Sequence, residues 1–271
     1  LQFIPYTDRL DYLASMSNNM VYCLAVEKLM QVTLPPRAEY IRVIMAELNR
    51  IASHLVWFGT FALDLGAITP FLYAFREREK ILDLFEMTCG QRLTYNYLRF
   101  GGVSCDISVK FIEDTKSFCK YFPPKVDEYD KLFSGNAIVI GRTKNIAVLS
   151  KDKAIDYGCS GPVLRGSGLK YDVRKDEPYS IYPSLDFAIP TGVTGDNLGR
   201  YLVRMEEMRQ SVRIIEQAVE KIPAGEFIAK VPRIIKPPAG EVYVKIESPR
   251  GELGIFLVSD GSAKPYRLKI R

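Results

Sequence analysis

Apolar side chains recur at helical spacing along residues 35–66, and this stretch gives the strongest pattern in the chain. Two prolines open it, at the position where a missing N–H costs a helix nothing. The residues that repeat at i, i+3, i+4 and i+7 are Ile41, Ile44, Met45, Leu48, Ile51, Ala52, Leu55 and Val56, with Tyr40, Val43 and Trp57 on the other side. A helix that is apolar on more than one face belongs in the middle of a domain. We therefore predict a central buried helix.

Charged residues also occur on this predicted helix, at Glu39, Arg42, Glu47 and Arg50. An unpaired buried charge is costly, so each of them should find a partner or water. The only histidine of the chain, His54, lies on the same helix. A Ser-His-Asp or Cys-His site would depend on His54 alone, and a single helical histidine is more often a packed residue. Acid–base chemistry would then fall to Tyr, Asp, Glu, Lys or Arg.

Helical periodicity predicts further helices on both sides of the central one. They cover residues 10–31, with Thr7 and Asp8 as the N-cap pair, and residues 71–86, 91–102, 106–122, 125–135 and 195–221. Pro123 and Pro124 separate two of these helices, and residues 133–142 could extend the second of the two. The charged run at residues 76–80 predicts a solvated or salt-bridged helix face. Residues 146–149 predict a short strand, followed by a helical turn up to residue 157.

The C-terminal end changes character and predicts a β meander. The segments VYVKIES, LGIFLVSD and PYRLKI alternate or are β-branched, and turn residues separate them at 249–251 and 260–261. Before them, four prolines in residues 222–240 indicate a long loop. We therefore predict an α+β fold that is mainly α. A long-helix body over residues 1–240 and a small antiparallel meander over residues 241–271 would share one core as a single domain.

Composition narrows the classes of protein that fit. The net charge of +5 is spread without a basic block, which disfavours nucleic-acid binding. No apolar run reaches the roughly 18 residues of a membrane span, so a membrane role should be peripheral or through partners. The chain starts at Leu1 without an initiator Met, and we expect a fragment of a longer chain.

Two possible cofactor sites find little support. The five cysteines, Cys23, Cys89, Cys105, Cys119 and Cys159, form no C-x-x-C pair and have no close histidine. Reduced thiols are therefore more plausible than a metal site. The glycine-rich stretch at residues 158–172 lacks the Lys-Ser/Thr ending of a phosphate-binding P-loop. Groups for chemistry are instead concentrated in residues 8–12, at Asp64 and in residues 95–99, although each could equally be a buried structural ion pair.

Several long motifs resemble a known family. They are PYTDRLDYLASM, PPRAEYIRVIMAELNRIASHL, ALDLGAITPFLYAFREREKILDLFE, GQRLTYNYLRFGGV and ESPRGELGIFLVSDGSAKPYRLKIR. Together with the segments between them, they resemble the D subunit of NADH–quinone oxidoreductase, respiratory complex I, over almost the whole chain. That family is in turn similar to the large subunit of nickel–iron hydrogenases. The resemblance therefore implies a long-helix bundle of the nickel–iron hydrogenase large-subunit type.

The resemblance also implies roles for single residues. Tyr12 matches the catalytic tyrosine that hydrogen-bonds the quinone headgroup, and Thr60 matches a threonine that lines the pocket. Asp64 matches a catalytic aspartate behind a quinone-binding histidine, which would lie upstream of Leu1. Arg9 and Arg99 match arginines that approach the terminal iron–sulfur cluster carried by a small partner subunit.

One departure concerns the pH response of the cluster. Thr94 stands where many relatives have a histidine near the cluster. Because histidine titrates near neutral pH and threonine does not, we expect no pH-dependent tuning of the cluster through this position.

As a whole, the resemblance implies a core subunit of the peripheral arm that couples quinone reduction to proton translocation. Its partners would be the small iron–sulfur subunit of B type, a C-type subunit and the membrane subunits. NADH would be used by the complex, although relatives exist that take electrons from other carriers. No metal would be bound by this chain itself. Its place would be the cytoplasmic face of the cell inner membrane, or the matrix or stroma side in an organelle.

Two other functions remain open. The large subunit of a membrane-bound nickel–iron hydrogenase would need two C-x-x-C pairs near the chain ends, and those ends are outside this sequence. A purely structural helical scaffold would show no loss of turnover when Tyr12 is changed.

Overall fold

The computed structural model describes residues 2–271 and shows a mainly helical α+β fold. The helices are α1 (Ile4–Thr7), α2 (Ser15–Met30), α3 (Pro36–Asp64), α4 (Ile68–Cys89), α5 (Val109–Tyr129), α6 (Ala137–Thr143), α7 (Lys151–Asp156), α8 (Gly161–Gly166), α9 (Val173–Asp176) and α10 (Asn197–Lys221). Short turns of other helix types are η1 (Tyr12–Ala14), η2 (Asp130–Ser134) and η3 (Tyr182–Ser184). The strands are β1 (Leu98–Arg99), β2 (Gly102–Val103), β3 (Gly240–Ser248), β4 (Gly251–Ser259) and β5 (Arg267–Ile270).

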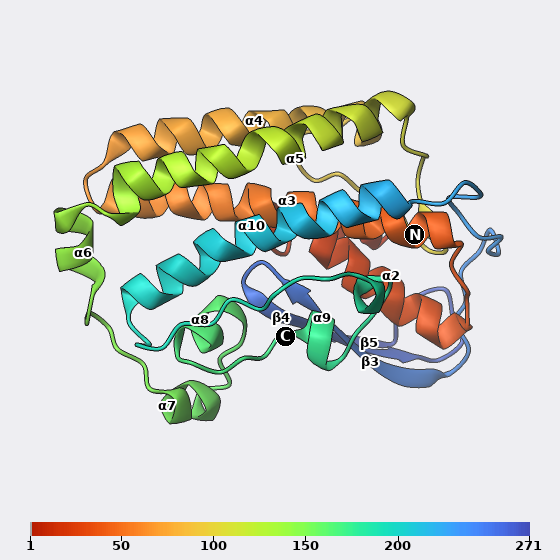
Figure 1. The fold of residues 1–271 in the computed structure, drawn as a ribbon. Coiled ribbons are helices and arrows are strands. Elements are labelled where there is room, and N and C mark those ends of the chain that lie inside the picture. Colours follow the sequence, from red (N-terminus) through yellow and green to blue (C-terminus); the bar gives the residue numbers. More distant parts are fainter. Residues whose placement is uncertain (1) are drawn as a thin grey trace.

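The long helices form the body of the molecule (Figure 1). Helices α4 and α5 lie along one side, α3 and α10 lie beneath them, and the sheet β3–β4–β5 lies against α2. Within the described residues, no helix is both long enough and apolar enough to cross a membrane.

Helix α3 is the central buried helix that the sequence predicts. Pro35 has an extended backbone and precedes it, and Pro36 is its first residue. Along most of its length the side chains on all faces are buried between α4, α10 and α2. Its charged residues Arg42, Glu47 and Arg50 are buried too and all have ion-pair partners. Glu39 is partly buried and accepts a hydrogen bond from the Ser180 hydroxyl at 3.5 Å, so the expectation that the charges of this helix find partners is confirmed.

The other long helices are also confirmed, with one correction. Residues 106–135 were expected to form two helices broken at Pro123 and Pro124, but α5 continues through both prolines. The residues that α5 buries recur at helical spacing on both sides of the prolines: Phe111, Thr115, Phe118, Phe122, Val126 and Tyr129. The two interior prolines cost about 3 kcal/mol each, and burial of four aromatic side chains outweighs this cost, since each is worth about 1.5–3 kcal/mol.

The prediction of a helix over residues 91–102 is wrong. These residues form a loop and the antiparallel hairpin β1–β2, in which Leu98 pairs with Val103. Thr94, Asn96 and Gly101 have positive φ angles of 53°, 45° and 87°, which no right-handed helix can contain. Tyr95, Tyr97 and Leu98 are buried, but they face the core from a loop and a short strand rather than from a helix.

Three smaller predictions also need correction. The first long helix begins at Ser15 rather than at residue 10, because residues 8–11 form a separate turn after α1. Residues 146–149 form no strand, since Asn145 and Ala147 have positive φ angles. Helix α6 is a separate helix rather than an extension of the preceding one, because Gly135 and Asn136 are not helical. The charged run on α4 is salt-bridged, which is one of the two expected alternatives: Arg76 pairs with the buried Glu77 and, at 3.9 Å, with Glu128 of α5.

The C-terminal meander is confirmed. Strand β3 pairs antiparallel with β4 from Gly240↔Ser259 to Ser248↔Gly251, and β4 pairs antiparallel with β5. Gly251 adopts a φ of +126° in the tight turn between β3 and β4. A Cβ there would lie 2.6 Å from the Ser160 hydroxyl oxygen, so glycine is required by both conformation and space. Residues 222–239 form the expected long loop.

Candidate functional site

The first part of the site is a turn that carries Tyr12. The Asp11 side chain caps η1 by accepting the backbone N–H of Leu13 at 3.3 Å. Asn49 of α3 holds the turn, because its amide nitrogen donates to the Leu13 carbonyl at 3.2 Å. The Tyr12 side chain is 58% exposed. The turn therefore has a well-anchored backbone, and its Tyr12 phenol is accessible at the surface of this chain.

The second part is the hairpin that carries Arg99. Arg42 and Glu27 form a buried ion pair beneath it, with Nη2 and Oε1 at 2.6 Å. Arg42 also donates to the backbone carbonyls of Arg99 at 2.6 Å and Gly102 at 2.9 Å. Glu27 accepts the backbone N–H of Gly101 at 2.7 Å. The pair therefore fixes the hairpin backbone and leaves the Arg99 side chain half-buried at the surface.

A buried carboxyl group connects these two parts. Asp8, which precedes the Tyr12 turn, accepts the backbone N–H of Asn96 at 3.1 Å. The Arg99 guanidinium in turn hydrogen-bonds the Asn96 side chain. Burial raises the pKa of Asp8, although the hydrogen bonds of Asn96 and Asn19 and the charges of Arg9 and Arg99 oppose this. The Asp8 carboxyl group is thus linked to Arg99 through Asn96 and is the sequence neighbour of Arg9.

Thr60 and Asp64 lie elsewhere, on the last two turns of α3. Both are exposed, and Thr60 donates back to the Val56 carbonyl at 3.0 Å. Asp64 has no ion-pair partner within the described residues. Thr60 is eleven residues beyond Asn49, which is roughly 16 Å of helix. No hydrogen bond in the described part of the chain joins Tyr12 to Thr60 or Asp64, so this chain alone does not bring the predicted quinone contacts together.

Two cations that the sequence did not single out are Arg250, beside the Tyr12 turn, and Arg204, which packs on Trp57 of α3. Arg250, in the tight turn between β3 and β4, pairs with Asp11 at 2.9 Å. The Arg204 guanidinium lies 4.9 Å from the ring centre of Trp57. Burial and the nearby cations Arg200 and Arg250 lower the pKa of Arg204 to about 10. Arg250 was inside a quoted motif, whereas nothing in the local pattern marks Arg204.

Beneath these surface groups lies a buried charge network. Its members are Glu47, Arg50, His54, Arg165, Asp172, Arg174, Glu207 and Glu247. Arg165 joins Glu207 at 2.6 Å and Glu247 at 2.8 Å. His54 Nε2 lies 2.8 Å from a Glu207 carboxylate oxygen. His54 is therefore a buried member of an ionic network, and its pKa is lowered by burial.

Two glutamates of the network, Glu47 and Glu247, have pKa values shifted in opposite directions. Burial would raise the pKa of Glu47, but Arg50 and Arg174 outweigh burial and lower it to about 2. Arg174 lies 3.0 Å from Glu47 and 2.7 Å from Asp172. Glu247 behaves differently, because burial and the nearby Asp172 raise its pKa to about 7 despite the arginines around it. One carboxyl group of the network therefore titrates near neutral pH.

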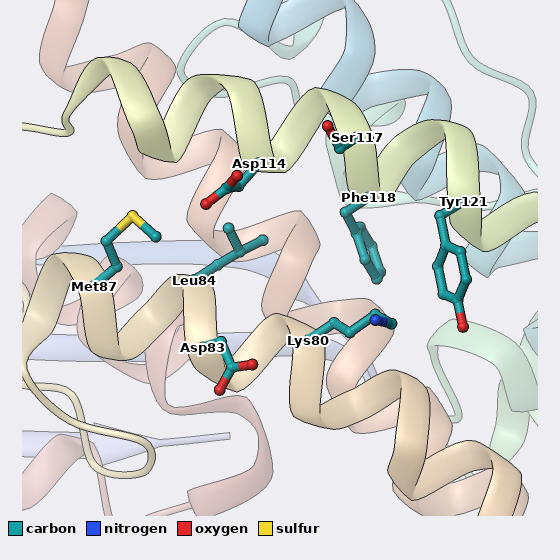
Figure 2. Close-up of a pocket in the computed structure, with 8 residues that line it drawn as sticks. All are labelled: Lys80, Asp83, Leu84, Met87, Asp114, Ser117, Phe118 and Tyr121. Atoms are coloured by element: carbon teal, nitrogen blue, oxygen red, sulfur yellow. The ribbon is translucent and has the colours of Figure 1, made fainter.

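A surface groove lies between α4 and α5 (Figure 2). It has a volume of about 380 Å³, and Leu84 and Phe118 face it from the two helices. None of the residues predicted for the quinone site or the cluster face lines it. Among residues 2–271, no group of three or more His, Cys, Asp or Glu side chains could hold a metal ion.

Comparison with known proteins decides the family. The family model described as "Respiratory-chain NADH dehydrogenase, 49 Kd subunit" matches residues 64–238 and 231–271. The chain is 56% identical over 270 residues to a D subunit of NADH-quinone oxidoreductase from Solibacter usitatus, covering all of this chain and 73% of that protein. It is 57% identical over 272 residues to the D subunit of the same enzyme from Dehalococcoides mccartyi, again over the whole chain and 74% of the relative. The D subunit from Desulforamulus reducens is 56% identical over 270 residues, covering all of this chain and 74% of the relative.

The chain belongs to the D-subunit family of NADH-quinone oxidoreductase. The family that the motifs predict is confirmed. As a member of this family, the chain is a component of complex I, an oxidoreductase of the respiratory chain, and membership implies other complex I subunits as partners. The roles of the individual residues Tyr12, Thr60, Asp64, Arg9 and Arg99 stay predictions.

Proposed function

We propose that this chain forms the quinone-reducing site of complex I together with a small iron–sulfur subunit of B type. The observation that carries the proposal is the exposed Tyr12 phenol on a turn anchored to α3, in a chain of the D-subunit family. The helical body would be a bundle of the nickel–iron hydrogenase large-subunit type. The mainly helical core with a small C-terminal sheet supports this.

In this proposal Tyr12 acts on the quinone headgroup. Two-electron reduction places negative charge on the quinone carbonyl oxygens, and a phenol hydrogen bond stabilises that charge. The same hydroxyl can lend a proton to the reduced headgroup. The anchored backbone supports such a role, because a donor must be held within hydrogen-bond reach of the reacting atom.

Thr60 and Asp64 would serve the same headgroup from α3. Thr60 would line the pocket. Asp64, exposed and without an ion-pair partner in the described residues, is available to an imidazole that approaches it from outside residues 2–271. A carboxylate behind an imidazole fixes its orientation and raises its basicity, which suits the second hydrogen-bond donor to the quinone.

Arg9 and Arg99 would face the iron–sulfur cluster that the partner subunit carries and that supplies the electrons. Their side chains fit this role, because arginine is the residue type that supplies a permanent positive charge, and both act on the buried Asp8 carboxyl group. Positive charge beside a cluster stabilises its reduced form. The C-type subunit and the membrane subunits would be the further partners, on the cytoplasmic face of the inner membrane or the equivalent face in an organelle. There quinone reduction would be coupled to proton translocation.

The test is a Tyr12→Phe variant in the assembled complex. Only the hydroxyl is removed, so we expect the complex to assemble and quinone reduction to fall by ~10²-fold or more. The assay is turnover with a short-tailed quinone. Tyr6→Phe is the matched control, since Tyr6 is 68% exposed on the neighbouring α1 and should leave turnover unchanged. Wild-type turnover in the Tyr12→Phe variant would overturn the assignment.

A further inference from the structure

Asp8 is a buried carboxyl group to which neither the family resemblance nor the proposed function gives a role. It lies between α1 and η1 with no exposed surface. One oxygen, Oδ2, accepts the Asn96 backbone N–H at 3.1 Å. The other, Oδ1, makes no hydrogen bond of good geometry within the described residues, although the Asn19 side chain lies close enough to lower the pKa of Asp8. A buried polar atom without a partner costs about 1–3 kcal/mol, so its presence here calls for an explanation.

The charged surroundings of Asp8 are the two cluster-facing arginines. Burial raises the pKa of Asp8, and the hydrogen bonds of Asn96 and Asn19 and the charges of Arg9 and Arg99 only partly oppose it. Arg9 follows Asp8 directly in sequence, and Arg99 belongs to the hairpin β1–β2. The other titratable neighbours are Cys89 at the end of α4 and Tyr95 in the loop before β1. Burial raises the pKa of both of these groups, so they stay neutral at working pH. Asp8 is therefore the one group in this set that can carry negative charge.

A chain of contacts runs from Asp8 to Arg99. The Asp8 carboxyl group accepts the Asn96 N–H, and the Asn96 side chain accepts a hydrogen bond from the Arg99 guanidinium. Asn96 has a positive φ of 45°, so its backbone is held in a conformation that few residues adopt. The hydrogen bond from Asn96 to Asp8 stabilises that conformation, and with it the position of Arg99.

Resting on the proposed function, in which Arg9 and Arg99 face the partner's cluster, we propose that Asp8 is a positioning and charge-compensating residue for this arginine pair. Its carboxylate fixes the Asn96 loop and offsets part of the positive charge of the two guanidinium groups. The electrostatic potential at the cluster then depends on the charges of Asp8, Arg9 and Arg99 together, and not on those of the two arginines alone. Buried charges are screened little by salt, so the effect reaches across the interface.

The test is an Asp8→Asn variant of the assembled enzyme, followed by paramagnetic resonance during a redox titration. Asparagine keeps an oxygen for the Asn96 N–H but removes the negative charge. We expect the midpoint potential of the partner's cluster to rise, because the arginines are no longer offset. Arg99→Met should lower the same midpoint, because it removes a positive charge. Opposite shifts from two variants that weaken the same set of contacts distinguish charge from loss of packing.

The pH profile gives a second readout that a merely structural role would not change. Below its pKa, wild-type Asp8 is protonated and resembles asparagine. The difference in midpoint between wild type and Asp8→Asn should therefore be full at alkaline pH and shrink as the pH falls through the pKa of Asp8.

Asp196→Asn is the matched control. Asp196 is also a buried carboxylate that accepts backbone N–H groups, those of Asn145 and Gly199, and belongs to the start of α10. The Asp196→Asn substitution should leave the midpoint potential of the partner's cluster unchanged. The proposal is overturned if Asp8→Asn keeps the wild-type midpoint at every pH or shifts it in the same direction as Arg99→Met. If Asp8→Asn does not assemble, a wild-type midpoint that is independent of pH overturns it.

The two levels of the argument fail separately. A shift in Arg99→Met without one in Asp8→Asn removes the role of Asp8 and leaves the proposed function standing. No shift in either variant removes the placement of Arg99 at the cluster as well.

Discussion

Replacing Arg42 by methionine should loosen the hairpin that carries Arg99 and leave the rest of the fold in place. The substitution removes the cation that pairs with Glu27 and the donors to the carbonyls of Arg99 and Gly102. Glu27 is only 3% exposed and would keep the Gly101 N–H as its donor in this group. Removing one partner of a buried ion pair costs about 3–5 kcal/mol. We expect this cost to destabilise the hairpin locally, because the ion pair hydrogen-bonds the hairpin backbone.

Hydrogen–deuterium exchange of the assembled complex measures the effect locally. A change of 1.4 kcal/mol is about tenfold in an equilibrium, so the amides of residues 99–104 should exchange at least ~10²-fold faster than in wild type. Peptides from α10 in the same sample give the reference, because the hydrogen bonds of the Arg42 side chain go to Glu27, Arg99 and Gly102.

Two controls separate the buried pair from ordinary surface charge. Arg37→Met removes a cation from the same helix, but its partner Asp106 is 38% exposed, so exchange should rise less than tenfold. In Arg42→Met combined with Glu27→Gln no unpaired charge is left, so the hairpin should exchange more slowly than in the single variant. Unchanged exchange of residues 99–104 in Arg42→Met would refute the reasoning.

Two further predictions concern single positions. A Cβ on Gly102 would lie 2.2 Å from the Phe227 carbonyl oxygen, so Gly102→Ala should lower the melting temperature, whereas Gly141→Ala meets nothing within 4 Å and should stabilise α6 by about 1 kcal/mol. Equal melting temperatures for the two variants would contradict this. Glu247→Gln should gain stability over wild type as pH rises from about 4.5 to about 7, by about 3 kcal/mol in all. The folded wild type holds a proton there that the unfolded chain releases, so wild-type stability falls in this window; urea denaturation at several pH values measures the difference, which should not be constant.

The long elements could be predicted because their signals are local. The apolar period of α3 and α10 and the alternation in β3 and β4 each appear within one continuous stretch. The hairpin β1–β2 could not be predicted in this way. Its short strands are fixed by Glu27 and Arg42, which come from two other helices, and by positive φ angles that Thr94 and Asn96 only rarely adopt.

The candidate site shows the same division. Tyr12 and Arg99 were found through family motifs, and their exposure and anchoring came from the structure. Asp8 was predicted to cap the first long helix. It hydrogen-bonds the Asn96 backbone instead, because residues 8–11 form a turn before that helix begins. The buried charge network was invisible in the sequence, because Arg165 and Glu247 are far apart in the chain and nothing local marks either as buried.

The buried charge network also limits how this chain can change during evolution. Its residues come from α3, α8, α10 and β3 and from α9 together with its N-cap residue Asp172, and all of them are buried. Loss of Arg165 alone would leave both Glu207 and Glu247 without their shared cation, a change that costs several kcal/mol of a total stability of about 5–15 kcal/mol. Substitutions at these positions are therefore tolerated mainly when a second one follows in another element. Divergence among relatives should be concentrated elsewhere, and where it reaches the network it should come in compensating pairs.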